Sequence, residues 1–432
     1  MMNQIKMIKG NIIDCDKDFS LRISEKSYLL WNEEGIIGRY TEEELPDSYR
    51  HLPLIDYKDN LILPGMTDLH IHAPQYAFRG VGADLELLDW LNCYTFLEEA
   101  KYKNENYARD AYRRFVKDLK ASFTCRACIF ATIHLPATKI LMDFLEESGL
   151  ITMVGKVNMD RNCMEELREK DAKTSVEDTA RWIEDCKKRY KNTRAIITPR
   201  FIPSCSDRLI RGLAGLRKRS KAPAQTHLSE NPAEVSWVAE LCPDSDFYLD
   251  AYDKRGLLEG SEKNSVIMAH CVYSGEEEIE MLREKKIFVA HCPQSNTNLS
   301  SGIAPVREFL NRGIKIGLGS DIAAGHSISL LRIAAEAIAV SKLRWRILDP
   351  ALKPLGIEEA FYILTRGGGE FFGKVGAFEE GFAADILVLD DEEIRVKEYD
   401  SPKQRLERVI YLSENIKLRD KYIAGRKIDL AS

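Results

Sequence analysis

Short apolar runs alternate with longer amphipathic stretches from residue 61 onward. In stretches such as 106–122 and 176–190, apolar residues recur every three or four positions, which predicts helices with one buried face. The apolar runs have the length and composition of buried strands, and we count eight of them, at 61–72, 124–132, 151–159, 195–201, 222–229, 265–271, 287–293 and 315–321. Alternating strands and helices indicate a parallel α/β sheet, and eight such units predict a closed (β/α)8 barrel of the TIM type.

The two ends of the chain have a different pattern from the barrel segment. The first sixty residues contain β-like runs joined by polar segments, with a turn at 32–35, and β-like runs return in ADILVLDD and KLRDKYIAGRKIDL. We therefore expect a small β-sandwich domain built from residues 1–65 and 373–432, beside a barrel that spans 66–372 and carries the site. The excursion over 73–122 is longer than a simple crossover needs, so part of it is expected to cover the barrel mouth.

Composition narrows the class of protein. The 432 residues include 62 Lys+Arg and 68 Asp+Glu, a net charge of −6 with both signs interspersed, which argues against a nucleic-acid or anionic-membrane partner. No apolar run approaches the roughly 20 residues of a membrane span, and the polar start lacks the core of a secretory signal. Ten cysteines are too sparse for a disulfide framework, so we expect a cytoplasmic protein. The single CxxC, Cys125 and Cys128, lies in a predicted strand, which favours buried structural thiols.

Histidines follow the ends of the predicted strands. His70 and His72 end the first strand at positions i and i+2, so both imidazoles project from one face and form half of a divalent-metal site. Further metal-type side chains end the fifth, sixth, seventh and eighth strands: His227, His270, His291 and Asp321. Because the carboxyl ends of barrel strands converge on one mouth, we expect a catalytic metal site with an open coordination position.

Glu230 follows His227 by three positions, in THLSENP. The Asn231–Pro232 pair disfavours regular extension, so a turn can bring the carboxylate over the metal. A carboxylate in that place can take a proton from water and return it to the substrate. Taken alone, Glu230 fits an ordinary surface loop better than a catalytic role.

These segments together resemble the amidohydrolase superfamily in its mononuclear, metal-dependent deaminase branch. The resemblance is carried by PGMTDLHIH, THLSE, MAHC, AHCPQSN and GLGSD. More narrowly, HAPQYAFRG, FATIH, VGKVNMD, TPRF and GLGSDIAAG resemble the guanine deaminases, over roughly residues 60 to 385. The resemblance implies hydrolysis of guanine to xanthine and ammonia, in purine catabolism or salvage, by a homodimer.

The resemblance also implies roles for single residues. One Zn²⁺ per chain would be held by four ligands, although such a set suits iron equally: His70, His72, His227 and Asp321. Glu230 would move protons, His270 would hold the attacking hydroxide by a hydrogen bond, and Asp321 would face the intermediate.

Gln75, in the PQ motif, and Arg200, in TPRF, match the family positions that recognise the purine, and Phe201 is a further candidate beside Arg200. Guanine offers O6 and N7 as adjacent acceptors, which suit the paired donors of an arginine. The amide of Gln75 can both donate and accept along another edge, and the ring of Phe201 can lie against the face of the base. Trp90, at helical spacing in LELLDWL, is expected to pack in the core, with a purine contact as the alternative.

Alternatives remain open from the sequence. A two-metal, dihydroorotase-like enzyme needs a lysine at the end of the fourth strand, where this chain has Pro199–Arg200, unless Lys156 belongs to that strand. Deaminases of adenosine derivatives, cytosine or triazines would share every ligand, and a non-catalytic nucleobase-binding barrel is the alternative of another class. The zinc deaminases with an H-x-E motif are excluded, because no histidine here begins one.

Overall fold

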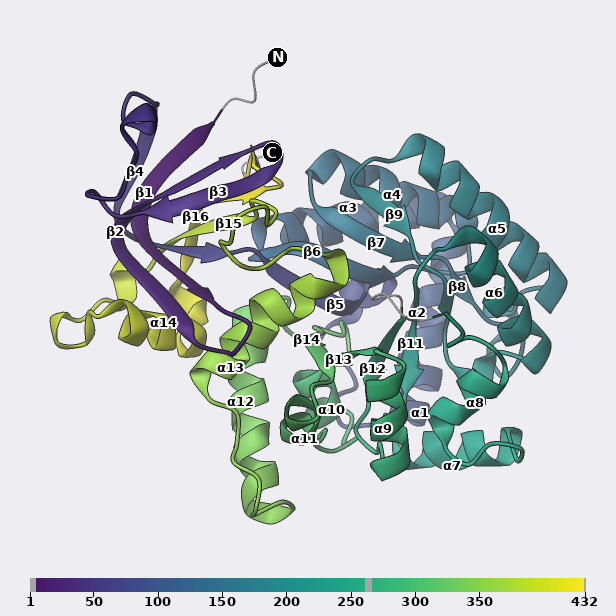
Figure 1. Ribbon diagram of the computed structural model, residues 1–432. Coiled ribbons are helices and arrows are strands. Elements are labelled where there is room, and N and C mark those ends of the chain that lie inside the picture. The colour runs from purple at the N-terminus through teal and green to yellow at the C-terminus, as the bar shows by residue number, and fades with distance from the viewer. Residues whose placement is uncertain (1–4, 261–265, 431–432) are drawn as a thin grey trace.

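The computed structural model describes residues 5–260 and 266–430 (Figure 1). The outer ends of the predicted terminal segments and Ser265, at the start of the sixth predicted strand, lie outside these ranges. Eight strands form one parallel sheet in the order β11-β12-β13-β14-β5-β6-β7-β9. In chain order they are β5 (Met66–His72), β6 (Thr124–Phe130), β7 (Ile151–Gly155), β9 (Thr193–Ala195), β11 (Ala224–Leu228), β12 (Val266–His270), β13 (Phe288–His291) and β14 (Lys315–Leu318). The predicted α/β architecture with an eight-stranded parallel sheet is confirmed.

A bridge between Ile197 and Ala224 closes the sheet. The fourth predicted strand occupies this place: the backbone N–H of Ile196 bonds to Val154 of β7 and that of Ile197 bonds to Pro223 beside β11, the alternation that an interior strand shows. The chain then continues as β10 (Thr198–Pro199), which pairs with β8 (Val157–Asn158) outside the main sheet. The fourth strand expected at 195–201 is therefore present as two short segments, because pairing of β9 with β7 ends at Ala195 and pairing with β8 begins at Thr198.

Helices surround the barrel strands, as Figure 1 shows. The predicted helices at 106–122 and 176–190 correspond to α3 (Glu105–Ala121) and α5 (Ala172–Arg189). Asn104 caps α3 by accepting hydrogen bonds from two backbone N–H groups of its first turn, which would otherwise have no partner. The other long barrel helices are α4 (Leu135–Ser148), α6 (Asp207–Ser220), α7 (Pro232–Leu241), α9 (Glu276–Glu284) and α12 (Leu330–Ile347). Shorter helices are α8 (Tyr248–Lys254), α10 (Pro293–Asn298), α11 (Val306–Asn311) and α13 (Ile357–Tyr362).

Both ends of the chain contribute to a second, seven-stranded sheet in the order β17-β16-β15-β4-β1-β2-β3. Its strands are β1 (Lys6–Cys15), β2 (Leu21–Asn32), β3 (Gly35–Tyr40), β4 (Leu54–Pro64), β15 (Ile386–Asp390), β16 (Lys417–Ile423) and β17 (Arg426–Lys427), and α14 (Pro402–Tyr411) connects β15 to β16. The two halves meet where β15 pairs with β4. The expected union of the two ends is present, whereas the two layers of a sandwich stay a prediction.

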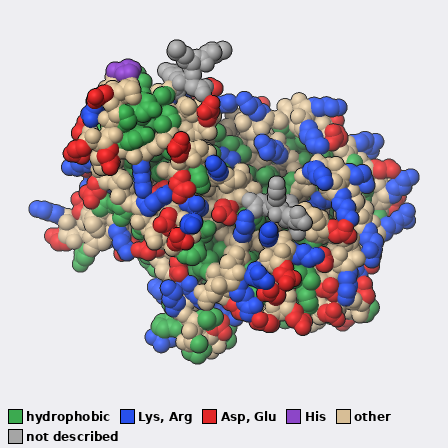
Figure 2. All heavy atoms as spheres, in the orientation of Figure 1, with side chains coloured by type: hydrophobic (Ala, Val, Ile, Leu, Met, Phe, Trp, Pro, Cys, Tyr) green, Lys and Arg blue, Asp and Glu red, His purple; other side chains and the backbone are tan. Residues whose placement is uncertain are grey.

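The surface carries both signs of charge, spread over the visible face in Figure 2. Among the described residues, no helix combines the length and the apolar character needed to cross a membrane. Cys125 and Cys128 are buried and free, and they belong to different clusters of core residues. Both thiols are therefore buried as expected, and they lie on opposite sides of β6.

Buried polar contacts attach the terminal sheet to the barrel. Arg126 of β6 forms a two-bonded ion pair with Asp385, with Nε–Oδ2 and Nη2–Oδ1 distances of 2.6 and 3.2 Å. Lys421 of β16 donates to the backbone carbonyls of Lys120, Ser122 and Thr124 at the start of β6. Burial lowers the pKa of Lys421 to about 8. Buried hydrogen bonds and an ion pair therefore hold the terminal sheet against β6 of the barrel.

We expect Asp385→Ala to lower the free energy of unfolding by about 3–5 kcal/mol, because it leaves the Arg126 guanidinium buried without its anion. Denaturant unfolding followed by circular dichroism measures this loss. As a control, Glu177→Ala removes an exposed partner 3.8 Å from Lys173 and should cost less than about 1 kcal/mol. Equal effects of the two substitutions would contradict the structural importance of the buried pair.

Candidate metal centre and substrate pocket

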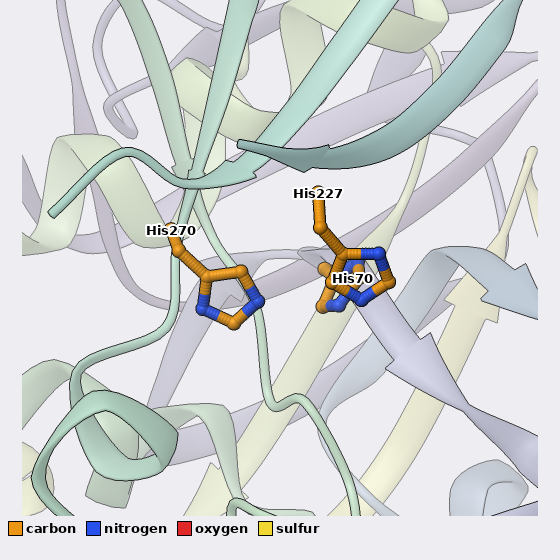
Figure 3. A group of neighbouring side chains, drawn as sticks. All are labelled: His70, His227 and His270. Carbon is orange, nitrogen blue, oxygen red and sulfur yellow. The ribbon is translucent and has the colours of Figure 1, made fainter. Parts of the chain in front are cut away.

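Four buried donor atoms converge at the carboxyl ends of β5, β11 and β14. The Nε2 atom of His72 lies 3.2 Å from Nε2 of His70 and 3.2 Å from Nε2 of His227. Oδ1 of Asp321 lies 3.2 Å from Nε2 of His70 and 3.5 Å from Nε2 of His72. Figure 3 shows His70 and His227 with His270 around the same space. The structure therefore brings together the four residues that the sequence assigns as ligands.

The spacing and protonation of these donors fit a divalent metal ion. Metal–nitrogen bonds of about 2.1 Å place tetrahedral donor atoms about 3.4 Å apart, close to the separations observed. Nδ1 of His227 donates to the backbone oxygen of Arg200 at 2.7 Å, so its Nε2 carries a lone pair directed at the other donors. Burial, together with neighbouring imidazoles, holds the pKa of His72 and of His227 well below the usual value, so both rings are neutral.

Asp321 supplies the anionic donor of the set. Burial opposes its ionisation, but interactions with His70, His270 and His72 hold its pKa well below the usual range. Its backbone N–H donates to the carbonyl of His70 at 2.8 Å, and its φ of 44° lies in the left-handed region. The backbone of His270, with a φ of 73°, also lies in the left-handed region. For residues other than glycine such a conformation costs of order 1–3 kcal/mol and is common at functional sites.

Glu230 lies over this cluster, but the chain turns at Ser229 and not at Asn231–Pro232, where α7 begins at once with Asn231 as its N-cap. Ser229, in the left-handed region with a φ of 47°, reverses the chain after β11, and the Glu234 carboxylate accepts from the backbone N–H of Glu230 at 2.9 Å. Burial, with the charges of Asp321 and Glu234, raises the pKa of Glu230 well above its usual value. A carboxyl group with this property can hold a proton and release it within the site. The surface-loop alternative is wrong, since only 3% of Glu230 is exposed.

His270 connects Glu230 to the donor cluster. Its Nε2 lies 3.4 Å from Oε2 of Glu230 and 3.8 Å from Oδ2 of Asp321. Nδ1 of His270 donates to Oδ1 of Asn296 at 2.9 Å, which leaves Nε2 as an acceptor facing the site. Burial lowers the pKa of His270 to about 4, so the neutral ring can accept a hydrogen bond from water.

A cavity of about 380 Å³, measured to its open mouth, adjoins these groups. Its wall combines the metal-type donors His72, His227 and Asp321 with Glu230 and with the three predicted purine-binding residues, Gln75, Arg200 and Phe201. Leu87, Trp90 and Leu91 cover one side, from α1 (Leu87–Trp90) and the π-helical turn that follows it. The excursion over 73–122 therefore covers the mouth as expected, and Trp90 lines the cavity besides packing in the core.

Glu99, which sequence reasoning did not identify, lies in α2 (Phe96–Ala100) behind the cavity wall. Its buried carboxylate accepts a hydrogen bond from Nε2 of Gln75 at 2.9 Å and forms an ion pair with Arg200. The segment CYTFLEEA has the composition of an ordinary solvated helix, and its two glutamates differ only in the direction in which they point. No signal in the sequence alone distinguishes Glu99 from Glu98.

Other candidates lie away from the centre. Lys156 follows β7, the third barrel strand, and is paired with Glu169, so the miscount that a two-metal site requires is excluded. Within the described parts of the chain, His291 belongs to no group of converging metal-type donors. His326 is exposed, with its Nδ1 3.1 Å from the amide nitrogen of Asn298.

Comparison with known proteins gives similarity over nearly the whole chain. Residues 61–428 match the amidohydrolase family. The guanine deaminase of Mus musculus is 35% identical over 432 residues, covering 95% of this chain and 92% of that protein. The guanine deaminase of Escherichia coli (strain K12) is 32% identical over 450 residues, covering 98% of both chains. A crystal structure of guanine deaminase from C. acetobutylicum with bound guanine in the active site has a TM-score of 0.94 and 44% identity, covering 98% of this chain and 100% of that one.

Proposed function

The chain belongs to the amidohydrolase family, and from this premise we propose that it hydrolyses guanine to xanthine and ammonia. The reaction breaks the exocyclic C–N bond at C2 of the base, so the chain is a hydrolase acting on C–N bonds. One observation carries the proposal: a single cavity is lined by metal-type donors, by a protonatable glutamate and by the pair Gln75 and Arg200. Full-length similarity to guanine deaminases supports the same substrate.

We propose that one zinc ion per chain is held by His70, His72, His227 and Asp321, with iron as the alternative that the same donors would accept. When bound, such an ion supplies Lewis acidity that makes water acidic enough to act as a nucleophile near neutral pH. The neutral imidazoles and the ionised Asp321 are the protonation states that this binding needs.

The residues of the chain would move two protons in each turnover. Glu230 takes a proton from the attacking water and delivers it to the ring nitrogen beside C2, while the water oxygen adds to C2. His270, through Nε2, and Asp321, through its second oxygen, orient the oxygen that attacks. Glu230 then takes the remaining proton from that oxygen and transfers it to the amino group, which leaves as ammonia as the C2 carbonyl forms. The raised pKa of Glu230 supports this role, because the group must be protonated in part of the cycle.

Arg200 and Gln75 would recognise the purine from the side of the cavity opposite the attacking water. The guanidinium offers paired donors for O6 and N7, and the Gln75 amide contacts another edge. Phe201, which lines the same cavity, would lie against a face of the ring.

Arg200→Lys is expected to lower kcat/KM for guanine about 10- to 100-fold, mainly through KM, because lysine keeps the charge but loses the paired donors. Steady-state kinetics with guanine measure the change. Arg194→Lys, in the exposed part of the preceding strand β9, serves as the control and should leave kcat/KM unchanged. An Arg200→Lys enzyme with the kinetics of the wild type would contradict the assigned role.

A direct assay tests the proposed function. Purified protein is incubated separately with guanine, adenine, cytosine and an aminotriazine, and ammonia release is followed with and without a chelator. We expect ammonia from guanine alone, together with xanthine, and a loss of activity with the chelator. Release from another base in place of guanine would favour a different mononuclear deaminase. Guanine binding without turnover would favour a nucleobase-binding barrel.

We further propose the division into a barrel over residues 66–372 and a β-sandwich domain from 1–65 and 373–432. The single residue Gly65 between β4 and β5 supports the first boundary. A homodimer in the cytoplasm, acting in purine catabolism or salvage, completes the proposal. The ten free cysteines fit a reducing compartment.

A further inference from the structure

Glu99 joins the two side chains that would recognise the base. Its Oε1 accepts a hydrogen bond from Nε2 of Gln75 at 2.9 Å, and its Oε2 accepts one from Nη1 of Arg200. All three side chains are buried, with 2–3% of each residue exposed. We propose that Glu99 is a positioning residue that sets substrate selectivity, by holding Gln75 and Arg200 with their N–H donors toward the base. This inference rests on the proposed function.

The orientation of the Gln75 amide is fixed from both ends. Its Oε1 accepts from the backbone N–H of Ala323 at 3.0 Å, and a backbone N–H can only donate. Its Nε2 faces the Glu99 carboxylate, which when ionised can only accept. The two constraints select the same orientation, so the amide cannot turn over to present its oxygen in place of its nitrogen. One N–H of Gln75 remains for a ligand in the cavity that this residue lines.

Arg200 needs an anion because it is buried and because guanine is a neutral base. An unpaired buried guanidinium would be drawn toward Glu230, with which Arg200 already interacts electrostatically. Glu99 offers an alternative carboxylate on the other side, and the Phe96 ring of the same helix lies 5.2 Å from the guanidinium carbon. With one Nη held by Glu99, the remaining N–H groups are available to a ligand.

The recognition end of the cavity consequently presents donors to the base. A base with acceptors at positions 6 and 7 satisfies these donors, whereas an amino group at position 6 meets them with further donors. Guanine and 2,6-diaminopurine make this comparison, because both carry the reacting amino group at C2 and they differ in the group at C6 and in the hydrogen that only guanine carries at N1. The change in the ratio of their kcat/KM values between wild type and variant therefore reports the donor array, since the intrinsic reactivities of the two bases are the same with either enzyme.

Glu99→Gln tests the inference with little change in shape. The new amide has one acceptor and one donor, so it can satisfy only one of Gln75 and Arg200 and releases the other. We expect the ratio of kcat/KM for guanine to kcat/KM for 2,6-diaminopurine to fall about 10-fold or more. Metal content should stay at the value of the wild type. In an Arg200→Lys background, Glu99→Gln should cause a smaller further loss than in the wild type, because the part of its effect that acts through Arg200 is already present and only the part through Gln75 remains.

Glu98→Gln is the matched control, because Glu98 lies beside Glu99 on the same helix but contacts Lys101 and Tyr107. It should leave the ratio unchanged. A Glu99→Gln enzyme that loses activity equally on both bases would overturn the inference and assign Glu99 a general structural role. If Glu99→Gln folds poorly, Glu99→Asp is used instead, because it keeps the charge but withdraws it by one methylene. An unchanged ratio of kcat/KM for guanine to kcat/KM for 2,6-diaminopurine in Glu99→Asp would also overturn the inference. Wild-type protein without activity on guanine would instead refute the proposed function itself.

Discussion

Glu230→Gln is expected to lower kcat for guanine deamination by on the order of 10³-fold or more, while guanine binding and metal content stay close to wild type. Glutamine preserves the shape of the side chain but can neither take a proton from water nor deliver one to the ring. Steady-state ammonia release gives kcat, and elemental analysis of the purified variant gives the metal content. The two measurements together separate loss of proton transfer from loss of the site.

The control for this prediction is Glu240→Gln, which neutralises an exposed glutamate on the same helix α7 that follows Glu230. Its kcat should equal that of the wild type. Full activity in Glu230→Gln would refute the proton-transfer role. A variant that had lost its metal as well would show that Glu230 serves mainly to hold the donor cluster together.

His227→Ala is expected to reduce bound metal to a small fraction of one ion per chain and to lower activity by on the order of 10³-fold or more. The substitution removes one of four converging donors, and it also removes the hydrogen bond that His227 makes with the backbone of Arg200. Metal analysis after gel filtration and ammonia release from guanine measure the two effects. In the wild type, a chelator should abolish activity and added zinc should restore it.

His326→Ala is the matched control for ligand removal, since His326 is an exposed histidine outside the donor cluster. It should keep one metal ion per chain and wild-type activity. Retention of a full equivalent of metal in His227→Ala would contradict the assignment of this residue as a ligand.

The proposed metal ligands were predictable because their positions depend on regular secondary structure. His70 and His72 share a face through the two-residue period of a strand, and the parallel barrel brings the ends of β11 and β14 to the same mouth. For these ligands a local rule acts together with one property of the barrel. Glu230 was assigned by its spacing from His227 and by resemblance, but the turn that places it lies at Ser229 and not at Asn231–Pro232 as expected.

The residues proposed to recognise the base were predictable only in part. Gln75 and Arg200 were recognised by resemblance, but their partner Glu99 lies in an excursion that no periodic pattern describes. The Arg200–Glu99 contact joins residues 101 positions apart, and it depends on how a short helix and a π-helical turn pack over the mouth. The interruption between β9 and β10 was also missed, because the apolar run at 195–201 predicts a strand but not the residues at which its pairing stops and resumes.

The pairing of β15 with β4 has a consequence for biosynthesis. Only Gly65 separates β4 from β5, the strand that bears His70 and His72, yet β4 gains this neighbour from residues 386–390. Until residues 386–390 have been synthesised and have folded, one edge of β4 has no strand beside it. A chain that lacks β15 would still contain His70, His72, His227 and Asp321 but would leave this edge unprotected, and such products should be prone to aggregate or to be degraded.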